Sequence, residues 1–247
     1  MSFKAIFFTI LILLLAAFGA VKIMVLGNPA SHFNQTIRFR LGEYSWLRTA
    51  FGLHRPGDAR GEYLSGQGPV MIEWFKPQAE DVDQNLLQEF ADRVAAATGR
   101  RTELVYGGAV SDGTVPLANL DTFRFKAAIQ TPPGGSNLLV FFTQDYSPRS
   151  AEELAAPYQE FGLVVSLSAH RSFLGALGQH QNEYLLTSLL RAFGGQLGLP
   201  AGSDDGCVMK TPPGIGGRPY ELYSQTSPAD FCAAEKAALQ QLKTQFN

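Results

Sequence analysis

The sequence predicts an α/β domain preceded by one apolar N-terminal helix. From residue 69 onward, apolar runs rich in β-forming residues alternate with amphipathic helical patterns, and residues 5–21 carry no charge. The chain has 247 residues, of which 45% are hydrophobic and 17% charged, a composition typical of a globular domain. Its formal net charge of −2 gives no electrostatic basis for binding nucleic acid.

The N-terminal segment is long and apolar enough to cross a bilayer. Residues 5–21 are uncharged and the apolar pattern resumes after Lys22, while about 20 apolar residues span the hydrocarbon core. A cleaved signal peptide is the alternative, because Lys4 and the small residues Ala17 and Gly19 also suit a signal. The length favours an uncleaved single-pass anchor. The short N-terminal tail favours a cytoplasmic N-terminus with the body outside, periplasmic or extracellular.

We predict three parts of the chain: residues 1–27 form the anchor or signal, 28–68 a juxtamembrane linker, and 69–247 the domain. Glycines interrupt every periodic run in the linker, apart from one short amphipathic pattern near residues 41–51. Several aromatic and basic residues of the linker suit either a membrane surface or a cover for the domain: Phe39, Tyr44, Trp46, Arg48, Phe51, His54 and Arg55.

The domain begins with a strand, helix, strand unit. Residues 70–75 are rich in β formers and predict a strand. Residues 81–98 predict a helix, because apolar residues recur at helical spacing, acidic residues crowd the start and Gly99 follows the end. A second strand is predicted at 102–106, and the crossover should be right-handed.

More strands and two further helices follow along the chain. Strands are predicted at 123–129, 138–142 and 162–168, with a capped short helix or loop at 147–153. A long helix from about residue 181 to 194 and a final helix over 228–246 show apolar residues at helical spacing.

The most informative stretch joins the end of the long helix to a cysteine-methionine turn. The helix breaks at Gly194 and Gly195, turns at Gly198 and the following Leu-Pro, and returns through Cys207-Val208-Met209. This framework resembles the active-site segment of metzincin zinc proteases, and within them the archaemetzincins. In that family, HExxHxxGxxH supplies three zinc-binding histidines and a glutamate base, and a Met-turn follows.

The resemblance covers residues 69–247 and implies a mixed, mostly parallel twisted sheet with long helices. Gly198 matches the turn glycine and Met209 the Met-turn, whereas the three histidines and the glutamate are replaced by Arg191, Ala192, Gly195 and Ala201. We therefore expect no metal or other cofactor and a catalytically inactive domain, a pseudoprotease. Arg191 either offers a positive charge to a carboxylate, such as a peptide C-terminus, or pairs with an acid of the domain.

The resemblance also places Cys207 and Cys232 at two corners of a second zinc site, whose other corners are Gly202 and Glu235. Two thiolates alone do not close a tetrahedral zinc site. We expect the two cysteines to form a disulfide in an extracytoplasmic compartment, with a reduced pair as the alternative.

A binding role follows from these expectations. The cleft, edged by the strand at 123–129 or at 138–142, would take an extended peptide by strand addition, or the anchored domain would be an accessory subunit of a membrane complex. The rival is an active hydrolase or peptidase with a relocated site. Its candidate residues are His170, His180, Asp204 and Asp205, which otherwise suit surface histidines and an exposed acidic turn.

Overall fold

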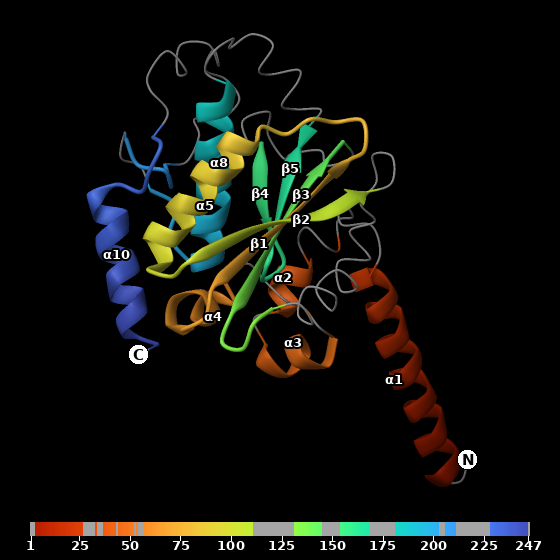
Figure 1. Ribbon diagram of the computed structural model, residues 1–247. Coiled ribbons are helices and arrows are strands. Elements are labelled where there is room, and N and C mark those ends of the chain that lie inside the picture. The colour runs from red at the N-terminus through yellow and green to blue at the C-terminus, as the bar shows by residue number, and fades with distance from the viewer. Residues whose placement is uncertain are drawn as a thin grey trace, which may run out of the picture. The chain divides into compact units, whose positions relative to one another are not determined.

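The computed structural model describes residues 3–26, 33, 37–42, 44–51, 53, 57–110, 131–144, 154–167, 181–202, 206–210 and 228–246. They belong to two compact units that divide mainly between Arg55 and Pro56 (Figure 1). The predicted domain boundaries after residues 27 and 68 stay predictions.

The N-terminal unit contains three described helices: α1 (Phe3–Leu26), α2 (Arg38–Leu41) and α3 (Ser45–Phe51). Within α1, the 20 residues Ile6–Val25 have a mean hydropathy of 2.6, which is enough for a membrane span or a signal sequence. The short helix predicted near residues 41–51 corresponds to α3. The other short helix, α2, precedes it and ends at Gly42, whose N–H bonds to the Arg38 carbonyl.

The larger unit is built on a five-stranded sheet in the order β2-β1-β3-β5-β4. Its strands are β1 (Val70–Pro77), β2 (Thr102–Val110), β3 (Ser136–Thr143), β4 (Ala155–Tyr158) and β5 (Gly162–Ser166). All neighbours pair in parallel except β4, which joins β5 antiparallel. Leu139 and Val140 lie on opposite faces of β3 and both are fully buried. A parallel sheet covered on both faces explains the continuous apolar runs of the sequence.

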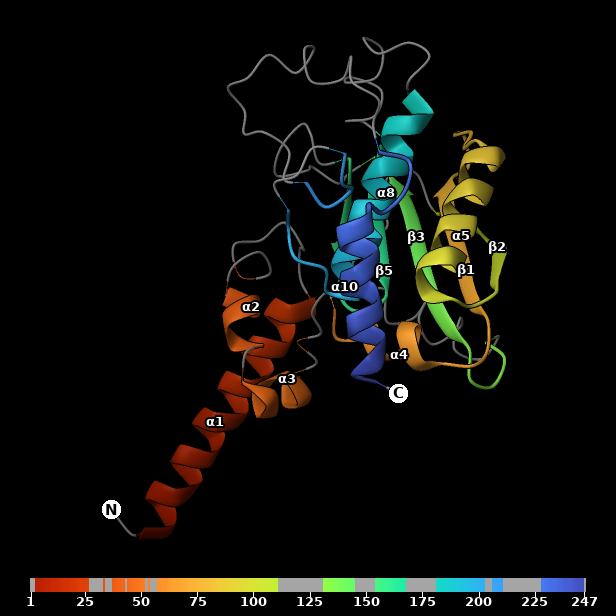
Figure 2. The same ribbon diagram turned by 90° about the vertical axis from the view of Figure 1, so that its left-hand side faces the viewer.

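Helices pack against the sheet and build one core with it. Figure 1 shows α5 (Gln84–Thr98), α8 (Gln181–Leu197) and α10 (Ala233–Thr244) gathered on one side of the sheet, and Figure 2 shows the same helices from that side. Asp83 caps the start of α5 by accepting the Asn85 N–H, and Gly99 ends it with φ 74°. The predicted α/β fold with a mostly parallel sheet and long helices is confirmed.

A short helix, α4 (Arg60–Ser65), lies within the range predicted as linker, yet its Tyr63 and Leu64 belong to the core. Arg100 fixes it to the sheet. This arginine is 8% exposed, and its guanidinium donates to backbone oxygens of α4 and of the segments that precede β1 and β3, and to a serine hydroxyl at the start of β3. One buried cation therefore holds three chain segments together.

Some expectations change in the structure. The strand over 138–142, predicted as a cleft edge, is wrong in that role, because β3 lies between β1 and β5 in the interior of the sheet. The long helix runs three residues past Gly194 to Leu197, and the final helix begins at Ala233. The predicted elements at 123–129 and 147–153 lie outside the described residues.

Candidate functional site

The C-terminal end of α8 turns sharply at Gly198. This glycine has φ 80°, a left-handed conformation that a residue with a side chain rarely adopts. Its N–H donates to the Gly195 carbonyl at 3.1 Å, and the Leu199 N–H donates to the Gly194 carbonyl at 2.9 Å. These two bonds satisfy the last carbonyls of the helix and redirect the chain, as the sequence predicted for this glycine.

The Met-turn packs directly onto the helix end. Met209 is 7% exposed, and a Cβ built on Gly194 would lie 2.3 Å from its sulfur and 3.2 Å from the Phe231 ring. Only a glycine therefore fits at position 194 while the methionine stays where it is. The Gly202 N–H donates to the Met209 carbonyl at 2.8 Å, which pairs the segment after the helix turn with the Met-turn.

The positions of the resemblance motif carry other side chains and other contacts. The Arg191 Nε donates to the Val208 carbonyl at 2.9 Å, so the guanidinium fastens the Met-turn to α8. Ala192 is buried, Gly195 faces Pro157 of β4, and Ala201 is exposed after the turn. None of these four side chains is a zinc ligand, and a zinc ion does not fit beside a guanidinium cation in that role.

Arg191 pairs with no carboxylate among the described residues. The predicted ion pair with an acid of the domain is thus not seen within that part of the chain. Its alternative role, the binding of a carboxylate on a partner, stays a prediction. The hydrogen bond to Val208 holds the Arg191 guanidinium at the junction of α8 and the Met-turn.

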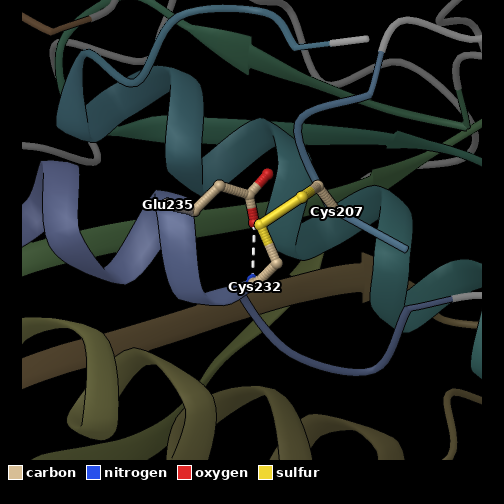
Figure 3. Close-up of side chains that lie close together, drawn as sticks. All are labelled: Cys207, Cys232 and Glu235. Atoms are coloured by element: carbon tan, nitrogen blue, oxygen red, sulfur yellow. Dashed lines mark hydrogen bonds between the residues drawn. A yellow bond between two sulfur atoms is a disulfide. The ribbon is translucent and has the colours of Figure 1, made fainter. Parts of the chain in front are cut away.

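The predicted disulfide between Cys207 and Cys232 is confirmed, with Cα atoms 5.0 Å apart. Glu235 lies beside it (Figure 3). Its carboxylate accepts the N–H groups of Met209 at 2.6 Å, Cys232 at 2.9 Å and Val208 at 3.2 Å. The side chain is 8% exposed. It therefore caps α10 and holds the Met-turn at the same time.

The ligand atoms of Cys207, Cys232 and Glu235 lie within 4.8 Å of one another, close enough in principle to hold an ion. The two sulfurs are bonded to each other, however, and both carboxylate oxygens accept backbone N–H groups. The chemistry of this cluster is that of a structural clamp. The resemblance had placed Glu235 at a lost cysteine position, and its spacing of three residues from the helix N-cap was the missed signal.

Gln196 is a second buried polar residue that the sequence did not single out. It is 0% exposed, and its Nε2 donates to the carbonyls of Gln159 at 3.2 Å and Gly162 at 2.7 Å. Its Oε1 accepts the Gly57 N–H at 3.4 Å. One side chain of α8 thereby fixes the turn between β4 and β5.

His170, His180, Asp204 and Asp205 lie outside the described residues. The relocated site that they suggest therefore stays a prediction.

A hollow of about 420 Å³ lies beside β2, the strand at the other edge of the sheet from β4. It is lined by Trp74, Lys76, Gln84, Leu104 and Tyr106. The Trp74 and Tyr106 rings are in contact, with centroids 4.6 Å apart, and Tyr106 is 50% exposed. Water therefore reaches the Tyr106 ring, whereas Trp74 is only 4% exposed.

Glu73 belongs to the neighbouring strand β1, and burial raises the pKa of its carboxyl group above the usual value. A Cβ on Gly107 would lie 2.7 Å from Glu73 Oε1 and 2.3 Å from the Phe75 ring. The register between β1 and β2 shifts at this point, so Gly107 forms a bulge that makes room for both side chains.

Comparisons with known proteins give structural matches alone. No family model and no curated protein matches the sequence. The similar solved structures include archaemetzincins. The archaemetzincin of Methanopyrus kandleri is 17% identical with a TM-score of 0.48, and the match covers 72% of this chain and 96% of that one.

Two further structures give comparable values. The zinc-dependent peptidase of Methanocorpusculum labreanum is 16% identical with a TM-score of 0.48, covering 68% of this chain and 99% of that one. The archaemetzincin of Archaeoglobus fulgidus, complexed with malonate, is 14% identical with a TM-score of 0.40, covering 69% of this chain and 99% of that one. The sequence-based prediction that the chain is not an enzyme is contradicted by this comparison, since a zinc-dependent peptidase is among the similar structures.

Proposed function

We propose that this chain binds polypeptide in an extended conformation along the outer edge of β2, from a position anchored in a membrane by α1. The observation that carries the proposal is the hydrogen-bonding pattern of β2. Parallel strands bond through alternate residues, and the Val70 N–H donates to the Arg101 carbonyl at 2.8 Å. Thr102, Leu104 and Tyr106 therefore turn their backbone N–H and carbonyl groups away from β1.

The residues that carry these outward groups lie at the surface of the strand. The three residues are partly or largely exposed, and within the described part of the chain no other strand pairs with this edge. An added peptide strand would take up these backbone groups, as in other sheets that bind peptides by strand addition. The bulge at Gly107 interrupts the regular alternation of this edge, although β2 continues to Val110, and it limits the length of regular strand that the edge accepts.

The hollow beside the edge would provide side-chain preference. Leu104 and Tyr106 turn their side chains to the face where Trp74 lies, so an added strand would place alternate side chains over the same hollow. The Lys76 ammonium already contacts the Glu80 carbonyl and lies 3.7 Å from Asp81. Beside the polar side chains of Lys76 and Gln84, the exposed Tyr106 ring gives the hollow an aromatic part, which favours an apolar or aromatic peptide side chain there.

A matched pair of substitutions tests the edge. Thr102→Pro removes an outward N–H without removing a bond to β1, whereas Thr102→Ala keeps that N–H. Selection of ligands from a degenerate octapeptide library by the detergent-solubilised chain supplies the probe. One lost backbone bond should weaken binding by about 0.5–1.5 kcal/mol, or roughly 2- to 12-fold, in the proline variant alone. Equal affinity of both variants, or no selected peptide, would refute the edge as the binding site.

The anchor is supported by the length and the apolar character of α1. We infer that it stays uncleaved and that the larger unit faces away from the cytoplasm. The intact mass of the purified chain reports cleavage. Protection from a protease added outside sealed cells would place the larger unit in the cytoplasm and refute this orientation.

A second candidate function is peptide hydrolysis with groups from His170, His180, Asp204 and Asp205. The positions of these residues in the sequence favour it. His180 directly precedes α8, and the two aspartates lie between Gly202 and Gly206, just before the Met-turn. Elemental analysis and a general peptidase assay on the same sample test it. Near-stoichiometric zinc, removed by a chelator together with hydrolysis, would support it. Turnover that survives alanine at all four positions would refute it.

A further inference from the structure

The segment after α1 presents large aromatic side chains to the outside of the N-terminal unit. Tyr44 is 59% exposed and Trp46 is 68% exposed, and Ile37 nearby is 40% exposed. Tyr44 directly precedes α3, and Trp46 lies in its first turn. The exposed Arg40 adds a cation close by in the sequence. Tyrosine and tryptophan favour the membrane-water interface, where the ring is buried and the polar atom stays hydrated.

The contact between α3 and α1 gives the depth of this segment. The rings of Phe18 in α1 and Phe51 at the end of α3 lie 4.6 Å apart between centroids. Phe18 precedes Lys22 by four residues and Val25, the end of the apolar window, by seven. At about 1.5 Å per residue, Phe51 reaches roughly 6–10 Å below the end of the span.

That depth matches an interfacial helix. Amphipathic helices that lie in the plane of a bilayer bury their apolar face about 5–10 Å into the boundary between headgroups and acyl chains. A segment held against α1 at Phe18 cannot stand clear of the lipid if α1 crosses it. The exposed aromatic residues then have an apolar environment instead of water.

We propose that α2 and α3 form an interfacial collar around the outer end of α1, with Tyr44 and Trp46 inserted among phospholipid headgroups and Arg40 facing phosphate. The proposal rests on the membrane anchor of the proposed function and is independent of peptide binding. Its occupant is the phospholipid bilayer that α1 crosses, because α3 packs on that helix.

The two tryptophans of the chain allow a direct test. Trp74 is 4% exposed within the larger unit, so Trp74→Phe leaves Trp46 as the single fluorophore, and Trp46→Phe leaves Trp74. Both full-length variants are reconstituted in phosphatidylcholine vesicles brominated either near the headgroup or near the chain end. We expect Trp46 emission to shift to the blue and to be quenched more strongly by the shallow bromines. Trp74 emission should be unaffected by either lipid.

If Trp74→Phe does not fold, the difference between the wild-type chain and Trp46→Phe gives the Trp46 signal without a change in the core. Flotation of the same vesicles reads the anchor separately. If the protein floats but Trp46 emission stays red-shifted and unquenched, the collar is refuted and the anchor is not. A protein partner on this face would give that result. Protein that does not float overturns both, whereas loss of peptide binding in Thr102→Pro leaves the collar untouched.

Discussion

Glu235→Ala should lower the free energy of unfolding by about 3–5 kcal/mol, because it leaves three backbone N–H groups without their acceptor in a buried place. Hydrogen bonds to a charged group contribute about 1.5–3 kcal/mol each, which sets an upper bound near 9 kcal/mol for three of them. Water that enters the vacated space would satisfy part of the loss. Glu235→Gln should cost about 1–3 kcal/mol, since its amide keeps one acceptor oxygen.

The disulfide holds the same junction, so the two effects can be separated. It closes a loop with a sequence separation of 25 residues, for which the chain-entropy relation gives about 3.5 kcal/mol. The reduced Glu235→Ala chain should therefore lose about 6.5–8.5 kcal/mol if the contributions add, which is comparable to the whole stability of many domains.

Urea unfolding of the full chain in detergent, followed by Trp74 fluorescence in a Trp46→Phe background, measures these changes. Gln240→Ala is the control, because Gln240 is an exposed residue of the same helix and its replacement should change stability by less than about 0.5 kcal/mol. If Glu235→Ala unfolds at the same urea concentration as Gln240→Ala, in oxidised and reduced protein alike, the carboxylate does not hold the Met-turn.

Three further predictions use the same assay. Gly194→Ala should lower the free energy of unfolding by about 1–3 kcal/mol, because its Cβ would lie 2.3 Å from a methionine sulfur. Gly195→Ala, whose Cβ would have its nearest neighbour at 3.4 Å, should raise it by up to about 1 kcal/mol through helix propensity. Equal effects of the two variants would contradict the packing at Gly194. Arg100→Lys should cost about 2–4 kcal/mol, since an ammonium cannot reach every acceptor of the guanidinium, and the exposed Arg101→Lys should change stability by less than about 0.5 kcal/mol. Burial raises the pKa of Glu73, so its ionised form opposes folding at neutral pH; Glu73→Gln should stabilise the chain there, and the gain should vanish as the pH falls below about 4.3, the pKa of an unfolded glutamate.

The central strands could be predicted because burial on both faces leaves continuous apolar runs in the sequence. The edge strand β4 could not. Its residues, Ala155 to Tyr158, include two alanines and a proline, none of them a β former. They form a strand because β5 offers a partner, and Pro157 is tolerated because the strand lies at the edge of the sheet.

The sequence predicted the turns of the candidate site but not its long-range hydrogen bonds. Gly198 and Met209 occupy the expected turn and packing positions, because glycine conformation and helix spacing are local properties. The roles of Glu235 and Gln196 depend on which distant N–H and carbonyl groups the fold brings to them. Spacing alone does not carry that information. The uninterrupted apolar run at 138–142 did predict an interior strand and not an edge strand, since such a run is typical of a strand buried on both faces.

The bond between Cys207 and Cys232 also decides what a cut in the chain would do. Residues 208–231 lie inside the covalent loop that it closes. A protease that nicks the backbone there leaves the C-terminal fragment, with α10, joined to the rest of the protein, and the two pieces separate on a gel only after reduction. A protease recognition sequence could therefore be inserted in this loop and cut without releasing α10. The disulfide, and not the peptide chain between the two cysteines, would then join the Met-turn to α10.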